Sequence, residues 1–131
     1  MTVDIVVLKK NHLNIELLLI KRKNEPFKDF WALPGGFVNE NEDLEVAAIR
    51  ELFEETRIKI TKLEQLKAFG KPLRDPRNHV VSIAFLGFVK NNIEAIANDD
   101  AKDAKWFSTN KLPIVAFDHD EIINFALSKT K

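Results

Sequence analysis

The chain has 131 residues, no cysteine, and equal numbers of basic and acidic residues, 20 of each. This length fits a single domain over residues 1–131, and the absence of cysteine excludes disulfides and thiol chemistry. The zero net charge gives no broad basic surface for nucleic acid. We expect a cytoplasmic protein without a membrane partner, because residues 1–5 lack a secretory layout and no apolar run approaches the ~20 residues that span a bilayer.

The first third of the chain predicts two strands and a loop. Residues 3–8 are apolar and β-branched, and residues 16–22 read as a second strand that is buried on both faces. Arg22 stands where this strand ends, so it is either a surface charge or a contact to phosphate or ribose. In residues 30–38, a proline and the Gly35-Gly36 pair break regular structure and allow a ligand to approach the backbone.

Apolar residues at helical spacing predict a helix that begins near residue 44, with Asp43 or Asn41 as its N-cap. A helical wheel places Glu51, Glu54 and Glu55 within an arc of about 100°. Carboxylates about 6 Å apart repel one another by roughly 3 kcal/mol per pair at an effective dielectric of about 20. A hard divalent cation removes this repulsion, so the pattern predicts a site for Mg²⁺ or Mn²⁺. The alternative is a solvated acidic face.

The spacing around these acids resembles the Nudix box, the signature of the Nudix hydrolases. Five residues separate Gly36 from Glu42, and seven more lead to Arg50-Glu51-Leu52-x-Glu54-Glu55-x-Arg57-Ile58. The resemblance implies that Glu51, Glu54 and Glu55 bind metal with the Gly35 carbonyl, that Arg50 orients a box glutamate, and that these residues carry catalysis. The family has glycine where this chain has Arg57, so we expect either a strained left-handed arginine or a remodelled turn.

The second half of the chain predicts further strands in residues 58–69, 80–89 and 105–107, followed by a helix. Asp118 and Glu121 form a capping-box pattern at the start of that helix. This order of elements indicates an α/β fold with a mixed sheet and helices on both of its faces. The resemblance covers nearly the whole chain and implies the Nudix α/β/α sandwich. Relatives often place a base or an extra metal ligand in the loop predicted at residues 91–105, where the candidates are Glu94, Asp99, Asp100 and Asp103.

A second resemblance concerns the loop Arg74-Asp75-Pro76-Arg77 and the strand after it, which look like the ADP-ribose pyrophosphatase branch of the family. Two arginines beside a stiff turn suit a diphosphate or a ribose phosphate. The alternative is a surface turn in which Asp75 pairs with an arginine. Trp31 is a further candidate substrate contact, by base stacking, and its alternative is core packing.

The resemblance implies Mg²⁺-dependent cleavage of a nucleoside diphosphate linked to another moiety, with ADP-ribose giving AMP and ribose 5-phosphate. Two alternatives stay open: a nucleoside triphosphate pyrophosphohydrolase that sanitises the nucleotide pool, and a non-catalytic sensor that binds ADP-ribose. The expected partner is a small nucleotide rather than nucleic acid or a membrane. A homodimer, common among similar pyrophosphatases, could complete the pocket.

Overall fold

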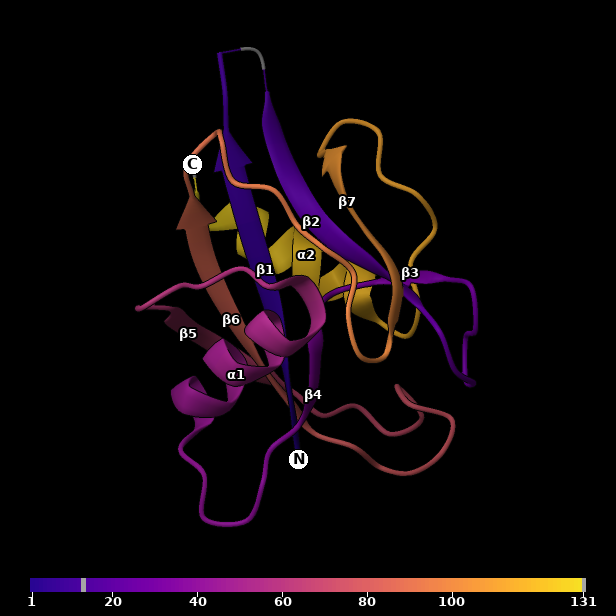
Figure 1. The fold of residues 1–131 in the computed structure, drawn as a ribbon. Coiled ribbons are helices and arrows are strands. Elements are labelled where there is room, and N and C mark those ends of the chain that lie inside the picture. Colours follow the sequence, from indigo (N-terminus) through magenta and orange to yellow (C-terminus); the bar gives the residue numbers. More distant parts are fainter. Residues whose placement is uncertain (13, 131) are drawn as a thin grey trace.

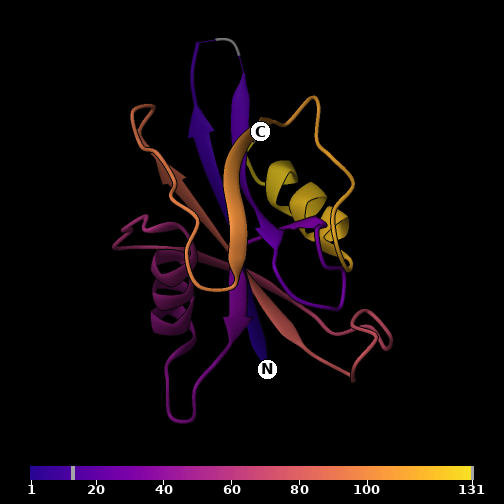
Figure 2. The same cartoon turned by 45° about the vertical axis from the view of Figure 1, so that its right-hand side comes forward.

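The computed structural model describes residues 1–12 and 14–130, which form one seven-stranded sheet with a helix on each face (Figure 1). In chain order the elements are β1 (Thr2–Lys10), β2 (Ile15–Arg22), β3 (Trp31–Ala32), β4 (Gly35–Phe37), α1 (Leu44–Thr56), β5 (Glu64–Phe69), β6 (Ser82–Val89), β7 (Ala101–Ser108) and α2 (His119–Ser128). Figure 2 shows α1 and α2 on opposite sides of the sheet. The predicted α/β sandwich is confirmed. Neither helix of the described residues is long and apolar enough to cross a bilayer.

The strand β1 lies at the centre of the sheet, whose main order is β3-β2-β1-β6-β5. It runs parallel to β6 and antiparallel to β2, so the sheet is mixed as predicted. The short strand β4 pairs with the beginning of β1, where Asp4 lies opposite Gly35 and Val3 opposite Gly36. This pairing places the glycine pair beside the first residues of β1.

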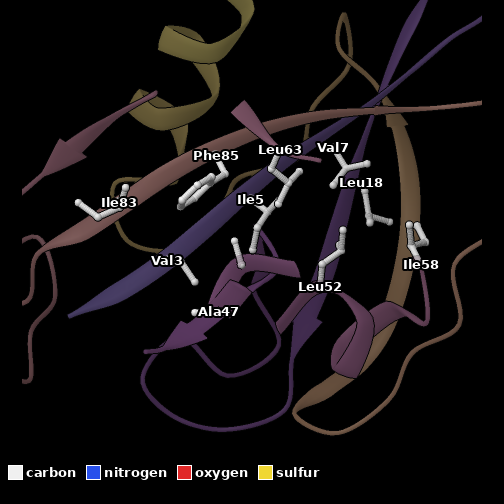
Figure 3. Close-up of a cluster of buried hydrophobic side chains, with 11 residues drawn as sticks. Val3, Ile5, Val7, Leu18, Ala47, Leu52, Ile58, Leu63, Ile83 and Phe85 are labelled. Atoms are coloured by element: carbon white, nitrogen blue, oxygen red, sulfur yellow. The ribbon is translucent and has the colours of Figure 1, made fainter. Parts of the chain in front are cut away.

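The alternation of side chains along β1 divides the core into two layers. Odd-numbered apolar residues belong to a cluster with α1, in which Ile5 and Leu52 are fully buried (Figure 3). Even-numbered residues belong to a cluster with α2, in which Val6 and Ile122 are fully buried. Each such side chain contributes about 1.5–3 kcal/mol by burial. Both helices are therefore held firmly against the sheet.

The two ends of α1 follow from its sequence. Asp43 is the N-cap, and its side chain accepts a hydrogen bond from the Glu45 amide at 3.2 Å. At the other end, Arg57 adopts the left-handed conformation with a φ of 64°, and its amide donates to the Phe53 carbonyl at 2.8 Å. Arg57 therefore takes the strained conformation that a glycine would adopt more easily, and the turn is not remodelled.

Three local predictions were wrong. The strand expected from residue 58 begins at Glu64, because Ile58 packs into the α1 cluster instead of extending a strand. The strand β7 already begins at Ala101, within the segment that was predicted to be a loop, because it pairs along β2. Asp118 does stand at the N-cap of α2, but its side chain makes no cap hydrogen bond, since both of its oxygens accept from Arg74.

Candidate active site

The Arg50 guanidinium lies at the centre of the charged face of α1. It donates to both carboxylate oxygens of Glu42 at 2.7 and 2.9 Å, and to Glu51 and Glu54 at 2.8 and 3.1 Å. It also donates to the Phe37 carbonyl at 3.1 Å, which ties α1 to β4. The hydrogen bonds from Arg50 lower the pKa of Glu42 to about 2. One arginine thus fixes the positions of three carboxylates.

Glu55 is the buried acid of this helix, with 5% of its surface exposed. Its Oε1 accepts a hydrogen bond from the Gly35 amide at 2.8 Å. The pKa of Glu55 is raised to about 8. Burial is the main cause, the neighbouring charges of Glu51, Asp100 and Asp4 act in the same direction, and the hydrogen bond from the Gly35 amide opposes them. In the resting protein this carboxyl therefore keeps its proton at neutral pH.

Neighbouring atoms approach Gly35 and Gly36 of β4 so closely that neither position has room for a side chain. A Cβ at Gly36 would lie 2.4 Å from Oε2 of Glu51, so the Glu51 carboxylate occupies the space that a side chain would fill. A Cβ at Gly35 would lie 2.2 Å from the Val3 carbonyl oxygen across the β1–β4 pair. Burial also raises the pKa of Glu51, although Arg50 opposes this. Two carboxylates with raised pKa values therefore converge on the glycine pair.

A cavity of about 210 Å³ opens beside these glycines. Its lining includes the carboxylates of Asp4 and Glu55 and the guanidinium groups of Arg22, Arg74 and Arg77. The cavity therefore joins acids that suit a cation to arginines that suit a phosphorylated ligand.

Comparison with known families decides what kind of site this is. Residues 1–125 match the model of the NUDIX domain, which is nearly the whole chain. The protein belongs to the NUDIX family.

Similar proteins include both enzymes and regulators. This NUDIX chain is 49% identical over 122 residues to an ADP-ribose pyrophosphatase of Methanocaldococcus jannaschii, which covers 92% of this chain and 69% of that protein. It is 32% identical over 134 residues to an ADPR responsive transcriptional repressor of Acinetobacter baylyi, which covers 98% of this chain and 53% of the repressor. The NUDIX domain of Shewanella oneidensis NrtR, solved in complex with ADP ribose, matches with a TM-score of 0.90 and 32% identity over 99% of this chain and 87% of that chain. The chain thus spans about half the length of the repressor that it resembles.

Two of the predicted substrate arginines in this NUDIX chain share an aromatic ring. The guanidinium carbon of Arg22 lies 5.0 Å from the centre of the Phe117 ring, and that of Arg77 lies 5.8 Å from it. Arg22 also donates to the Pro26 carbonyl at 2.8 Å, and burial lowers its pKa. Arg77 donates to both oxygens of Asp75 at 3.0 and 2.6 Å, which is the pairing that the sequence left as an alternative. Both arginines nevertheless line the cavity.

Of the other two predicted substrate residues, Arg74 lines the cavity but is paired with Asp118, and Trp31 lies outside the lining. The Arg74 side chain is 4% exposed, donates to both oxygens of Asp118 at 2.9 and 2.7 Å, and lies 3.8 Å from Asp4. Trp31 packs against Phe107 at a centroid distance of 4.9 Å, within the α2 cluster and outside the cavity lining. Arg74 therefore has a structural partner, and Trp31 follows the alternative of core packing.

The structure separates the four candidate acids of the 91–105 segment. Asp100 lines the cavity and is one of the charges that raise the pKa of Glu55. Asp99 and Glu94 are exposed and lie outside the cavity lining, and Asp103 is an exposed residue of β7 whose side chain accepts from the next amide. Asp100 is thus the member of this set that lies beside the box acids, and its role as a base stays a prediction.

Sequence reasoning missed a buried polar network in the cavity lining. The Asp4 carboxylate accepts a hydrogen bond from the Ser82 hydroxyl at 2.5 Å and lies 3.5 Å from Nε2 of His119. The other ring nitrogen of His119 accepts from the Leu33 amide at 3.0 Å. Burial lowers the pKa of His119, so the ring is neutral. The available signal was a charged residue, Asp4, inside the otherwise apolar stretch of residues 3–8 in β1.

The acids of α1 fit the divalent cation that NUDIX hydrolases generally use. Their oxygen atoms are the hard donors that such cations prefer, and the raised pKa values of Glu51 and Glu55 mark a place where added positive charge would be stabilised. Glu54 is 43% exposed and bonded to Arg50. Among residues 1–12 and 14–130, no group of three or more acidic or histidine side chains is placed to hold a metal ion, so the fit is one of donor chemistry. The roles of these glutamates and of the Gly35 carbonyl as metal ligands stay predictions.

Proposed function

We propose that this chain hydrolyses ADP-ribose to AMP and ribose 5-phosphate, with Mg²⁺ as its cation and Mn²⁺ as a substitute. The observation that carries the proposal is the cavity in which the buried acid Glu55 and the glycine pair lie together with Arg22 and Arg77. The 49% identity to a protein named ADP-ribose pyrophosphatase supports the same substrate. A related NUDIX domain of the same fold was solved with ADP ribose bound.

Different residues of the chain would bind the substrate, hold the cation and position the carboxylates. Arg22 and Arg77 offer several N–H donors to the diphosphate oxygens, and these donors also compensate the negative charge of the substrate. Glu51, Glu54 and Glu55 would hold the cation, which supplies further charge compensation and a more acidic water. Arg50 fixes the carboxylates through its hydrogen bonds.

The bond changes are those of a hydrolysis. Water forms a new bond to one phosphorus, the bond from that phosphorus to the bridging oxygen breaks, and the bridging oxygen leaves with the electron pair on the other phosphate. The proton of the water passes to a carboxylate, for which Glu55 and Asp100 are the candidates that line the cavity. Hydrolysis by direct attack of water needs no covalent intermediate between the substrate and the protein.

Amide substitutions of the box acids test this function. Glu54→Gln and Glu55→Gln should each lower kcat for ADP-ribose by about 10²–10⁴-fold, because they remove a charged donor or proton acceptor. Circular dichroism should show an unchanged fold. Glu94→Gln, at an exposed position outside the cavity, is the matched control and should retain kcat. Turnover near that of the wild type in both box variants would refute the assignment.

A substrate panel at fixed Mg²⁺ separates this function from its rivals. ADP-ribose should be hydrolysed with a higher kcat/KM than nucleoside triphosphates, and the reverse order would make the chain a triphosphate pyrophosphohydrolase. The similarity to an ADPR responsive repressor supports a second candidate, a domain that senses the ligand. Tight binding of ADP-ribose in calorimetry, with no turnover at any Mg²⁺ concentration, would establish that sensor function instead.

A further inference from the structure

Three successive residues at the start of α2 contact three different parts of the cavity. The Phe117 ring lies 5.0 Å from the guanidinium carbon of Arg22. Asp118 accepts two hydrogen bonds from Arg74, at 2.9 and 2.7 Å. His119 is 4% exposed and accepts a hydrogen bond from the segment that precedes the glycine pair. None of these side-chain contacts caps α2. The three side chains instead connect the start of the helix to other segments of the cavity lining.

The hydrogen bond to His119 fixes which ring nitrogen carries the hydrogen. The Leu33 amide can only donate, so Nδ1 at 3.0 Å is the acceptor and the neutral ring carries its hydrogen on Nε2. Nε2 lies 3.5 Å from Oδ1 of Asp4, so the N–H side of the ring is close to a carboxylate. The ring therefore bridges Leu33 and Asp4, and Asp4 is the residue of β1 that lies opposite Gly35.

The segment that His119 holds leads directly to the buried acid. Leu33 is 2% exposed and bonded to His119, the Pro34 carbonyl accepts from the Ile5 amide at 2.9 Å, and the Gly35 amide donates to Glu55 at 2.8 Å. Three consecutive residues are thus each fixed by a different element: α2, β1 and α1. The pairing of β4 with β1 also holds Gly35, so the bond from Leu33 to His119 adds a restraint on the chain just before the Gly35 amide.

We propose that His119 is a positioning residue: its Nδ1 holds Leu33 so that the Gly35 amide is aimed at the Glu55 carboxyl. The proposal deepens the proposed function and rests on it for its kinetic consequences. A buried neutral histidine carries a desolvation cost that an apolar side chain would avoid. The hydrogen bond that the ring accepts from Leu33 and its closeness to the Asp4 carboxylate therefore account for its place among the apolar residues of α2.

Two amide variants separate the two ring nitrogens. In His119→Asn the side-chain oxygen can take the place of Nδ1 and accept from Leu33, whereas in His119→Gln the amide reaches only the place of Nε2. Ile122→Val is the matched control, because it alters a buried residue of the same helix that lies outside the cavity lining. We expect His119→Gln to lower kcat for ADP-ribose by roughly 10- to 100-fold, with KM changed less than about 3-fold. His119→Asn should restore most of kcat.

Amide hydrogen exchange provides a readout that does not depend on activity. With a chelator present, His119→Gln should speed exchange at Leu33 and Gly35 by about 10-fold or more relative to the rest of the sheet, and neither His119→Asn nor Ile122→Val should do so. If the wild type does not hydrolyse ADP-ribose, the proposed function fails, while this exchange pattern still tests the positioning role.

Two results would overturn the inference. One is equal loss of kcat in His119→Asn and His119→Gln with Leu33 and Gly35 still protected, and the other is no effect of His119→Gln on either readout. If His119→Gln does not fold, nitrogen NMR of the wild type decides the geometry. An unprotonated Nδ1 supports the proposal, and a protonated Nδ1 contradicts it.

Discussion

Glu55 lowers the stability of the resting protein, and we predict that this effect grows with pH. The folded pKa of Glu55 is about 8, against an ordinary value of 4.5. Because the folded value is the higher one, the folded state binds the proton more tightly than the unfolded chain. The contribution of Glu55 to stability is then most favourable below pH 4.5, falls between pH 4.5 and 8, and is fully lost above pH 8. At 1.36 kcal/mol for each unit that separates the two pKa values, the full loss is about 5 kcal/mol.

The substitution Glu55→Gln isolates this effect, since an amide of similar shape does not ionise. Urea unfolding in the presence of EDTA should show the variant gaining about 4 kcal/mol of unfolding free energy relative to the wild type between pH 5 and pH 9. The same variant should be the inactive one described above. Glu64→Gln, at an exposed position of β5, should give a curve parallel to the wild type. If the unfolding free energy of Glu55→Gln also changes with pH in parallel with that of the wild type, Glu55 is not protonated in the folded protein and the reasoning is wrong.

Three further substitutions test other contacts of the site. Gly36→Ala places a Cβ 2.4 Å from a Glu51 oxygen, so Mn²⁺ binding measured by calorimetry should weaken by about 10-fold or more, and unchanged affinity would count against Glu51 as a ligand. Arg50→Lys removes the planar guanidinium donors that hold the carboxylates, so kcat/KM at saturating Mg²⁺ should fall roughly 10- to 100-fold. Full activity would show that the carboxylates do not need these hydrogen bonds. Arg74→Met leaves Asp118 unpaired in the interior and should lower the unfolding free energy at pH 7 by about 3–5 kcal/mol, whereas a loss below about 1 kcal/mol would contradict a structural role.

Local patterns predicted the parts of this molecule that depend on neighbours in sequence. The helical spacing predicted α1, and Asp43 was one of the two candidates for its cap. Propensity failed at Ile58, where the alternation of apolar residues serves packing against α1 rather than a strand. For Trp31 the sequence allowed both base stacking and core packing, and the side chain packs in the α2 cluster.

Contacts between distant residues could not be read from the sequence. The bond from Leu33 to His119 joins residues 86 apart, and the pair of Arg74 with Asp118 joins residues 44 apart. No spacing rule connects such positions, since the folded sheet alone brings them together. The sequence singled out the two arginines of the 74–77 loop and offered Asp75 as a partner for one of them, but it could not show that the other is held by Asp118 at the start of α2.

The lining of the cavity comes from residues that range from Thr2 to His119. The sequence of the box is complete once residue 58 has been synthesised, when less than half of the 131 residues exist and the turn that holds Leu33, at His119, has not been made. A nascent chain on the ribosome therefore carries the acids without the surroundings that orient them, and hydrolysis must wait until α2 has left the exit tunnel and docked. Shortening the chain before α2 would abolish activity although every box glutamate is retained.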